Sequence, residues 1–286
     1  MKVSIIGAGV IGKATGAGLS QVGHEVIFYD TEKDKSRELK EQGYSVAENL
    51  EAVNGCDVHF ICVPTPVPNG KMDLTYVETA VQELAVVISP QDKYQVIAIR
   101  STILPLTVQN RLVPLLKRHC RLKLGKQYGV CHNPEFLRAE HALEDFLDPP
   151  IIVIGTDDAR SSGIMKELYA PIKAPLLVTT PGNAEAIKLF SNVYNASKAS
   201  FFNEMYLVAE SLGLDHKVIS QGMTRSSLGV STPEYYTKGG YPFDGGCIPK
   251  DLAACITFLK EQGLDPGLFE EVSRINEEMK NLKKGK

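Results

Sequence analysis

Short apolar runs alternate with stretches of helical periodicity from the N-terminus to about residue 180. An apolar run at 3–6 leads into a helical pattern over 10–22, and a second run follows at 25–29. Runs of this length are typical of buried strands, and the periodic stretches between them are typical of helices that cover a sheet. Further strands are predicted at 58–63, 96–99, 128–131, 151–154 and 176–178, with helices among them at 76–88 and 159–169. This alternation predicts an α/β fold with a doubly wound, mainly parallel sheet.

The pattern changes after Pro181-Gly182, where helical periodicity takes over. No proline or glycine occurs from 184 to 212, and apolar residues recur there at helical spacing. These residues predict one long helix of roughly 40 Å, at about 1.5 Å per residue. Further helices are predicted at 215–223, 251–262 and 269–282, with a loop rich in glycine, proline and tyrosine at 226–249. We therefore expect an α/β domain of residues 1–181 and an all-helical domain of residues 182–286, with the long helix between them.

The long helix is apolar on more than one face and is longer than one small domain needs. A helix of this kind buries its outer face by pairing with a second copy of the chain. The segment 184–212 therefore predicts a homodimer.

The composition carries no sign of a nucleic-acid or membrane partner. Lys and Arg number 31 against 34 acidic residues, which gives a net charge of −3, and no long basic run occurs. The apolar runs are too short to span a bilayer, and the chain enters its first strand without a signal peptide. The six cysteines and six histidines do not cluster at metal-ligand spacing. We expect a cytoplasmic protein with no metal site, no nucleic-acid partner and no membrane partner.

A glycine-rich turn, Gly7-Ala8-Gly9-Val10-Ile11-Gly12, lies between the first predicted strand and the first helix. In the Rossmann-like form of this fold, two such glycines allow close approach of a pyrophosphate, and the third lets the helix pack on the strand. Asp30 ends the second strand, where a carboxylate accepts hydrogen bonds from the adenosine ribose. These residues predict that NAD binds and is preferred over NADP. Two alternatives stay open: a domain of this fold without a nucleotide, and Asp30 as the cap of the next helix.

Two further polar turns follow predicted strands, Cys62-Val63-Pro64-Thr65-Pro66 and Arg100-Ser101-Thr102. The carboxyl ends of strands are where this fold binds its ligands, so both turns are candidates for the site. The alternative is ordinary turn chemistry, because proline and threonine are common in loops.

Cys247 lies in the run Phe243-Asp244-Gly245-Gly246-Cys247-Ile248-Pro249-Lys250-Asp251. A helix N-terminus and a nearby lysine both favour the thiolate, which is the nucleophilic form, whereas the carboxylate of Asp244 opposes it. A thiol in the same chain as a hydride acceptor suggests oxidation through a covalent intermediate. The alternatives are a buried packing cysteine, and Asp251 as a helix cap.

Lys188 and Asn192 are four residues apart, so they share one face of the long helix. An ammonium and an amide one turn apart on a mostly apolar helix can meet one substrate oxygen. The alternatives are a solvated lysine and an asparagine bonded within the helix or across a packing interface.

Taken in order, these blocks identify a resemblance to the UDP-glucose/GDP-mannose dehydrogenase family that runs nearly end to end. The matching blocks are GAGVIG at 7–12, CVPTP at 62–66, ST at 101–102, NPEFLR at 133–138, EAIKLFSN at 185–192, FFNE at 201–204 and GGCIPKD at 245–251. The resemblance implies oxidation of the C6 hydroxyl of a nucleotide-linked hexose to a carboxylate, with two NAD per turnover.

The resemblance also assigns roles to individual residues. Cys247 resembles the nucleophile that holds the aldehyde as a thiohemiacetal, and Lys188 with Asp251 resembles the pair that manages protons. Asn192 and Lys188 resemble oxyanion donors, and Glu135 resembles the acid near the hydrolytic water. The implied catalytic set is Cys247, Lys188, Asn192, Asp251, Glu135 and Thr102. The implied cofactor set is Gly7, Gly9, Val10, Ile11, Gly12, Asp30, Lys35, Pro64, Thr65, Thr102 and Lys250. The implied substrate set is Glu135, Phe136, Leu137, Arg138, Lys188, Asn192, Tyr236, Phe243 and Gly245.

The sequence departs from the family pattern in two places. Family members usually continue into a third domain that binds the nucleotide part of the substrate, and this sequence has no counterpart of it. Three possibilities stay open: a shortened chain, a third domain on a separate chain, or a shorter enzyme with another substrate. In the loop, Asp244 and Pro242 stand where relatives have glycine. An added carboxylate raises a thiol pKa and disfavours an anionic substrate nearby.

Two other functions compete with the four-electron oxidation. A two-electron β-hydroxyacid dehydrogenase also has this fold, a long interdomain helix, and the pattern of Gly182, Lys188 and Asn192. It needs no catalytic thiol, so the block at 245–251 favours the four-electron enzyme. A non-catalytic NAD-binding protein is the third possibility, and the joint presence of the thiol, the lysine, the amide and Asp251 argues against it.

Overall fold

The computed structural model describes residues 1–90, 93–226, 242–243 and 248–284. The chain divides into two compact units, Met1–Asn192 and Val193–Lys286. The boundary expected at residue 182 falls at the start of a helix, whereas the compact units separate within that helix, after Asn192.

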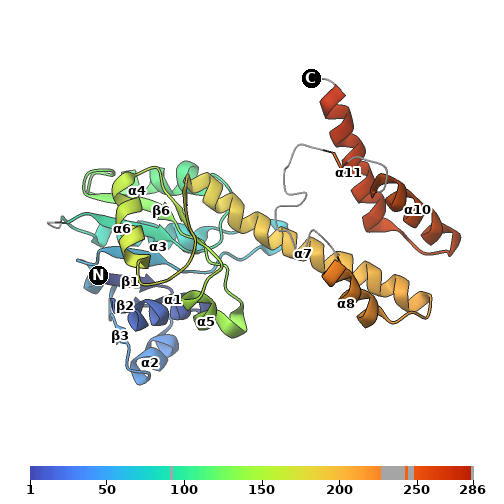
Figure 1. Ribbon diagram of the computed structural model, residues 1–286. Coiled ribbons are helices and arrows are strands. Elements are labelled where there is room, and N and C mark those ends of the chain that lie inside the picture. The colour runs from blue at the N-terminus through green and yellow to red at the C-terminus, as the bar shows by residue number, and fades with distance from the viewer. Residues whose placement is uncertain (91–92, 227–241, 244–247, 285–286) are drawn as a thin grey trace. The chain divides into compact units, whose positions relative to one another are not determined.

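The first unit is built on an eight-stranded sheet with the strand order β3-β2-β1-β4-β5-β6-β7-β8. Neighbouring strands are parallel except β6 and β7, which pair antiparallel where His132 faces Gly155. Helices lie on both faces of the sheet (Figure 1), so the fold class predicted from the alternation is confirmed. The strands are β1 (Lys2–Ile6), β2 (Glu25–Tyr29), β3 (Ser45–Val46), β4 (Val58–Ile61), β5 (Gln95–Ile99), β6 (Tyr128–His132), β7 (Ile152–Gly155) and β8 (Leu176–Thr179).

The helices of this unit connect the strands. They are α1 (Val10–Gln21), α2 (Lys33–Glu41), α3 (Thr75–Val87), α4 (Val113–His119), α5 (Ala142–Leu147) and α6 (Ala159–Tyr169). Short helical turns are η1 (Leu50–Val53), η2 (Pro68–Gly70), the π-helical η3 (Val108–Leu112) and η4 (Ala139–His141).

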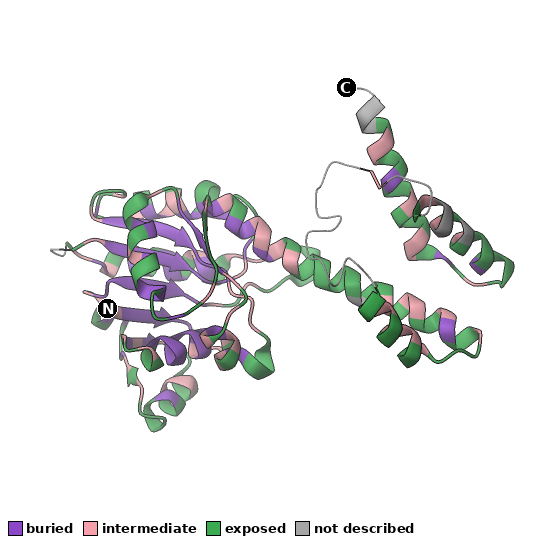
Figure 2. Ribbon diagram, in the orientation of Figure 1, coloured by how far each residue is buried: buried purple, intermediate pink, exposed green. Residues whose placement is uncertain are grey.

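The apolar runs of the inner strands are buried because the sheet is covered on both faces, whereas the run of the edge strand β8 is exposed. Along β5, Val96 and Ala98 join one core cluster with Phe28 of β2, while Ile97 and Ile99 join the opposite cluster with residues of α3 and α4. Strands covered on both faces have continuous rather than alternating apolar sequences, and this is the pattern of the predicted strands. Figure 2 shows the buried strands at the centre of this unit.

The long helix α7 (Pro181–Ser211) begins three residues before the start expected from the absence of proline and glycine. Proline is tolerated in the first helical turn because its missing N–H has no partner there. The Thr180 hydroxyl also accepts a hydrogen bond from Asn183 N at 3.3 Å. At the other end, Gly213 has φ +67° and Leu214 N donates to the Ala209 carbonyl at 2.8 Å, so a Schellman motif ends the helix.

The second unit is helical over its described residues. After α7 it contains α8 (His216–Ser226), α10 (Ile248–Glu261) and α11 (Gly267–Lys284). Phe201 of α7 packs edge-to-face on Phe269 of α11, with ring centroids 5.9 Å apart. Among the helices that the structure describes, none has the length and apolar character needed to cross a membrane.

Candidate active site

The glycine-rich turn between β1 and α1 has the geometry of a pyrophosphate cradle. Gly7 has φ +95°, a conformation that other residues rarely adopt, and a Cβ at this position would lie 2.7 Å from the Cys62 carbonyl oxygen. A Cβ on Gly12 would collide with the Gly7 carbonyl oxygen, so only glycine allows this helix–strand approach. A Cβ on Gly9, the N-cap of α1, would meet no protein atom within 4 Å. The space above the helix N-terminus is therefore open to an anionic group, and the residues fit a dinucleotide.

Asp30 is held at the end of β2 by two backbone amides. Its Oδ2 accepts from Ala8 N at 2.6 Å, and its Oδ1 accepts from Glu32 N at 2.8 Å. The alternative of a helix cap is wrong, because Glu32 is the N-cap of α2. The carboxylate is thus oriented by the glycine-rich turn, and each oxygen keeps a lone pair for a ribose hydroxyl.

A hollow beside Asp30 is lined by basic residues of α2. Lys33, Arg37 and Lys40 line it, whereas Lys35, which was expected on the adenosine side, donates to Glu32 Oε1 at 2.7 Å. This hydrogen bond raises the pKa of Lys35. Lys33, Arg37 and Lys40 were not predicted from the sequence as cofactor residues. Their spacing of four and three residues, which puts them on one face of a helix, was the signal that could have found them.

A second hollow, of about 240 Å³, lies where the carboxyl ends of β1, β4 and β5 meet. It is lined by Gly9, Val10, Ile11, Cys62, Val63, Pro64, Thr65, Arg100, Ser101, Thr102 and Glu135. The turns after β4 and β5 are joined there, since Thr65 Oγ1 donates to the Thr102 carbonyl at 2.8 Å. The structure therefore brings together the predicted cofactor residues of the glycine turn and of both polar turns, with Glu135 beside them.

Glu135 and Lys188 form a buried ion pair at this hollow. Lys188 Nζ lies 2.8 Å from Glu135 Oε1, with side chains 6% and 11% exposed. The other carboxylate oxygen accepts from Leu137 N at 2.6 Å, and the ammonium also lies 5.6 Å from the ring centroid of Phe136. A solvated lysine is thus excluded. Asn192 follows one turn later on α7 and is exposed.

Arg100 supports the segment that carries Glu135, a role that the sequence did not reveal. Its buried guanidinium donates to Asn133 Oδ1 at 2.8 Å and to the carbonyls of Asn133 and Pro134 at 3.3 Å. Asn133 in turn donates to the Val153 carbonyl at 2.8 Å. The only sequence signal was the position of an arginine directly after a buried strand.

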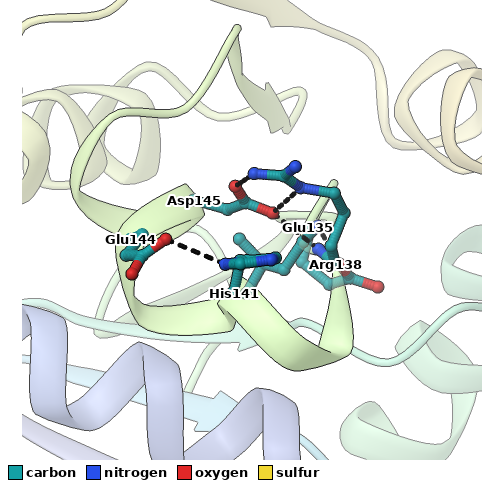
Figure 3. A network of polar contacts seen from close by, with 6 residues as sticks. Glu135, Arg138, His141, Glu144 and Asp145 are labelled. Atoms are coloured by element: carbon teal, nitrogen blue, oxygen red, sulfur yellow. Dashed lines mark hydrogen bonds and ion pairs between the residues drawn. The ribbon is translucent and has the colours of Figure 1, made fainter.

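Arg138, expected to contact substrate, is held by a carboxylate of the same segment. Its Nη2 donates to Asp145 Oδ1 at 2.7 Å, and its Nε and backbone N both donate to Asp145 Oδ2 (Figure 3). These hydrogen bonds lower the pKa of Asp145 to about 2. His141 lies next to them and contacts Glu144 at 3.0 Å. The Arg138 side chain is 71% exposed even so.

The remaining site predictions fall in the second unit. Cys247, Tyr236 and Gly245 lie outside the described residues, and for Lys250 and Asp251 only the backbone of α10 is described. The carbonyl of Phe243 accepts a hydrogen bond from Asn276 Nδ2 at 3.0 Å. In the described part of the chain, no group of three or more His, Cys, Asp or Glu side chains is arranged to hold a metal ion.

A dinucleotide cradle beside a buried Lys–Glu pair, at the carboxyl edge of a doubly wound sheet, is the arrangement expected of a nicotinamide-dependent dehydrogenase. Two family models match the chain. The NAD-binding domain of the UDP-glucose/GDP-mannose dehydrogenase family matches residues 1–53 and 44–173, and the central domain of that family matches residues 182–278. The chain belongs to the UDP-glucose/GDP-mannose dehydrogenase family. It is an enzyme that uses NAD to oxidise a sugar alcohol, as the resemblance implied.

Individual relatives agree with this assignment. The chain is 35% identical to the GDP-mannose 6-dehydrogenase of Pseudomonas aeruginosa, over 96% of this chain and 68% of the relative. It is 31% identical to the UDP-glucose 6-dehydrogenase of Rickettsia bellii, over 99% of this chain and 68% of the relative. The crystal structure of a ternary complex of the Pseudomonas aeruginosa GDP-mannose dehydrogenase superposes with a TM-score of 0.90 at 31% identity, covering 98% of this chain and 69% of that one. The chain therefore spans about two thirds of the length of these relatives.

Proposed function

We propose that this enzyme oxidises the C6 primary alcohol of a nucleotide-linked hexose to a carboxylate in two successive oxidations, the second of them on an intermediate bound to Cys247. The observation that carries the proposal is the buried Lys188–Glu135 pair, 2.8 Å apart, at the hollow lined by the glycine turn. The names of the relatives support the substrate class, since they act on GDP-mannose and UDP-glucose.

Bound NAD supplies the hydride acceptor for each oxidation. Asp30 accepts hydrogen bonds from the adenosine ribose and repels a 2′-phosphate, so NAD is preferred over NADP. The turn at Gly9 and the helix N-terminus behind it bind the pyrophosphate.

The proposed covalent steps begin after the first oxidation has produced an aldehyde. The Cys247 thiolate adds to the aldehyde carbon and forms a thiohemiacetal. Loss of a second hydride converts it to a thioester, water attacks the thioester carbonyl, and the C–S bond breaks to release the carboxylate and the thiolate. Overall, one alcohol and one water give one carboxylate, two hydrides that reduce two NAD, and three protons.

Lys188 and Asn192 stabilise the oxygen of the reacting carbon when it becomes negative. A buried ammonium held in place before the reaction stabilises such charge more strongly than water does. In this proposal Glu135 accepts a proton from the attacking water; its side chain lies at the same hollow, 2.8 Å from Lys188 Nζ. Asp251 serves the first proton transfer in this proposal.

The product ratio tests the four-electron reaction. With limiting GDP-mannose or UDP-glucose and excess NAD, we expect two NADH per sugar nucleotide and a product heavier than the substrate by one oxygen and lighter by two hydrogens. Absorbance at the NADH band and mass spectrometry of the product measure both. One NADH per sugar, with an aldehyde as the end product, would support the two-electron alternative instead.

We further propose that the enzyme is a homodimer through α7. Several large apolar side chains along this helix are exposed: Phe190, Val193, Tyr194, Phe201, Tyr206 and Leu207. Sedimentation at micromolar concentration should show a dimer, and the double variant Tyr194→Glu/Leu207→Glu should shift it towards monomer, because charges oppose apolar pairing. Lys198→Glu on the same helix is a matched control for added negative charge. A monomeric parent protein would contradict the proposal.

A further inference from the structure

Glu185 is a fully buried acid on the first part of α7, one turn before Lys188. Its exposed fraction is 0%, and its carboxylate is bonded to the backbone of a different segment. Oε1 accepts from Val108 N at 2.8 Å, and Oε2 accepts from Leu106 N. Burying a carboxylate is costly unless charge-assisted hydrogen bonds compensate for the lost water, and here two backbone amides do so.

One of the amides that bind Glu185, that of Leu106, belongs to the loop between β5 and η3, and the other, that of Val108, is the first of η3. This loop begins at the cofactor hollow with Thr102, whose carbonyl is held by Thr65. Within it, Leu106 has φ +69°, a conformation that costs a residue with a side chain about 1 kcal/mol or more. The Val108 amide opens the helical turn η3, where a carboxylate is favoured by the helix dipole. Glu185 therefore stabilises a strained turn that leads directly out of the site.

The first part of α7 contacts the rest of the unit closely on two sides. A Cβ on Gly155 of β7 would collide with the Ala184 side chain, and a Cβ on Gly182 would lie 3.0 Å from Leu106 Cδ2. Glu185 lies next to both contacts, and its carboxylate accepts the hydrogen bonds from the backbone amides of Leu106 and Val108. The rotation of α7 about its axis is thus set at Glu185, and Lys188 projects from the following turn onto Glu135.

We propose that Glu185 is a positioning residue for the oxidation. Its carboxylate accepts hydrogen bonds from the backbone amides of Leu106 and Val108. These bonds fix the position of Lys188 on α7 relative to that of Thr102 on the β5–η3 loop. Both sides of the site are aligned by one carboxylate that touches neither substrate nor cofactor. This inference rests on the proposed function, because it assumes that Lys188 takes part in the reaction.

Glu185→Gln tests the inference with almost no change in shape. One acceptor becomes an NH₂ group that faces a backbone N–H, so one of the two hydrogen bonds is lost. We expect kcat to fall by about 10- to 100-fold, as misplacement of a reacting group by about 1 Å produces. The dissociation constant of NAD, measured by titration, should change by less than about threefold, and the kcat pH profile should shift because the Lys188–Glu135 interaction loosens. Amide hydrogen exchange in the segment 104–110 should accelerate.

Asp158→Asn is the matched control. Asp158 is also a carboxylate that accepts backbone amides at a helix start, from Arg160 N at 3.2 Å and Ser161 N at 2.9 Å, and it does not line the cofactor hollow. We expect Asp158→Asn to lose about as much thermal stability as Glu185→Gln. Its kcat should stay within twofold of that of the parent enzyme, and its kcat pH profile should not change. If Glu185→Gln behaves like Asp158→Asn in kcat and pH profile, the inference is overturned.

Two further variants keep the outcome interpretable. If Glu185→Gln does not fold, Glu185→Asp is measured in the same way, and parent-like kcat and pH profile in that shorter acid would overturn the inference. Full activity of Lys188→Ala would contradict the proposed function itself. An inactive Lys188→Ala with a fully active Glu185→Gln would reject only the positioning role.

Discussion

Cys247→Ala should abolish formation of the acid while leaving the fold and NAD binding unchanged. Without the thiolate, the aldehyde cannot be held covalently, so the second oxidation has no substrate. The buried thiols of Cys56, Cys62 and Cys131 cannot substitute, since burial raises the pKa of Cys62 and Cys131 to about 12 and that of Cys56 to about 11. Product analysis by mass spectrometry and NAD titration measure the two effects.

Cys247→Ser should behave differently from the alanine variant. An ester hydrolyses less readily than a thioester, so a covalent adduct should accumulate and be visible by intact mass. Cys255→Ala, the loss of an exposed thiol on α10, is the matched control and should retain full activity. Complete acid-forming activity in Cys247→Ala would reject the four-electron mechanism and favour the two-electron alternative.

Lys188→Met should lower kcat by about 10²- to 10³-fold, the range seen when one donor to a developing oxyanion is removed. The same change leaves the Glu135 carboxylate, 11% exposed, without its cation, so we expect a loss of about 3 kcal/mol or more of unfolding free energy. Steady-state kinetics and denaturant titration measure the two quantities. Lys166→Met, an exposed lysine of α6, should change neither.

The double variant Lys188→Met/Glu135→Gln separates the two roles of the pair. Neutralising Glu135 removes the buried unpaired charge, so most of the stability should return, whereas activity should not. Recovery of activity together with stability would show that the pair is structural and that Lys188 does not act on substrate.

The sheet and its glycine turn were predictable because their signals are local. Strands buried on both faces require consecutive apolar residues, and β5 shows this at Val96, Ile97 and Ala98. Gly12 is required by its distance to Gly7, five positions away, so its spacing in the sequence already carries the geometry. The helix α7 was equally visible, apart from its first turn, where proline is compatible with a helix.

The partners of the polar side chains were not predictable, because they come from distant parts of the chain. From the sequence alone, Lys188 could equally have been a solvent-exposed lysine. Only the fold places its Nζ 2.8 Å from Glu135 Oε1. Arg100 was one arginine after a strand, and its bonds to the carbonyls of Asn133 and Pro134 exist because β5 and β6 are neighbours in the sheet. Glu185 was an ordinary helix acid in the sequence.

The sequence by itself thus determined the strands other than the two-residue β3, the long helix and the residue types of the site. Each of these depends on backbone preferences and apolar periodicity over a few neighbouring positions. The tertiary structure decided which charges are buried and what they bind. Glu185, for example, accepts hydrogen bonds from the backbone amides of Leu106 and Val108. The physical reason is that a buried charge is stable only beside partners that the folded sheet brings to it, and no local pattern specifies them.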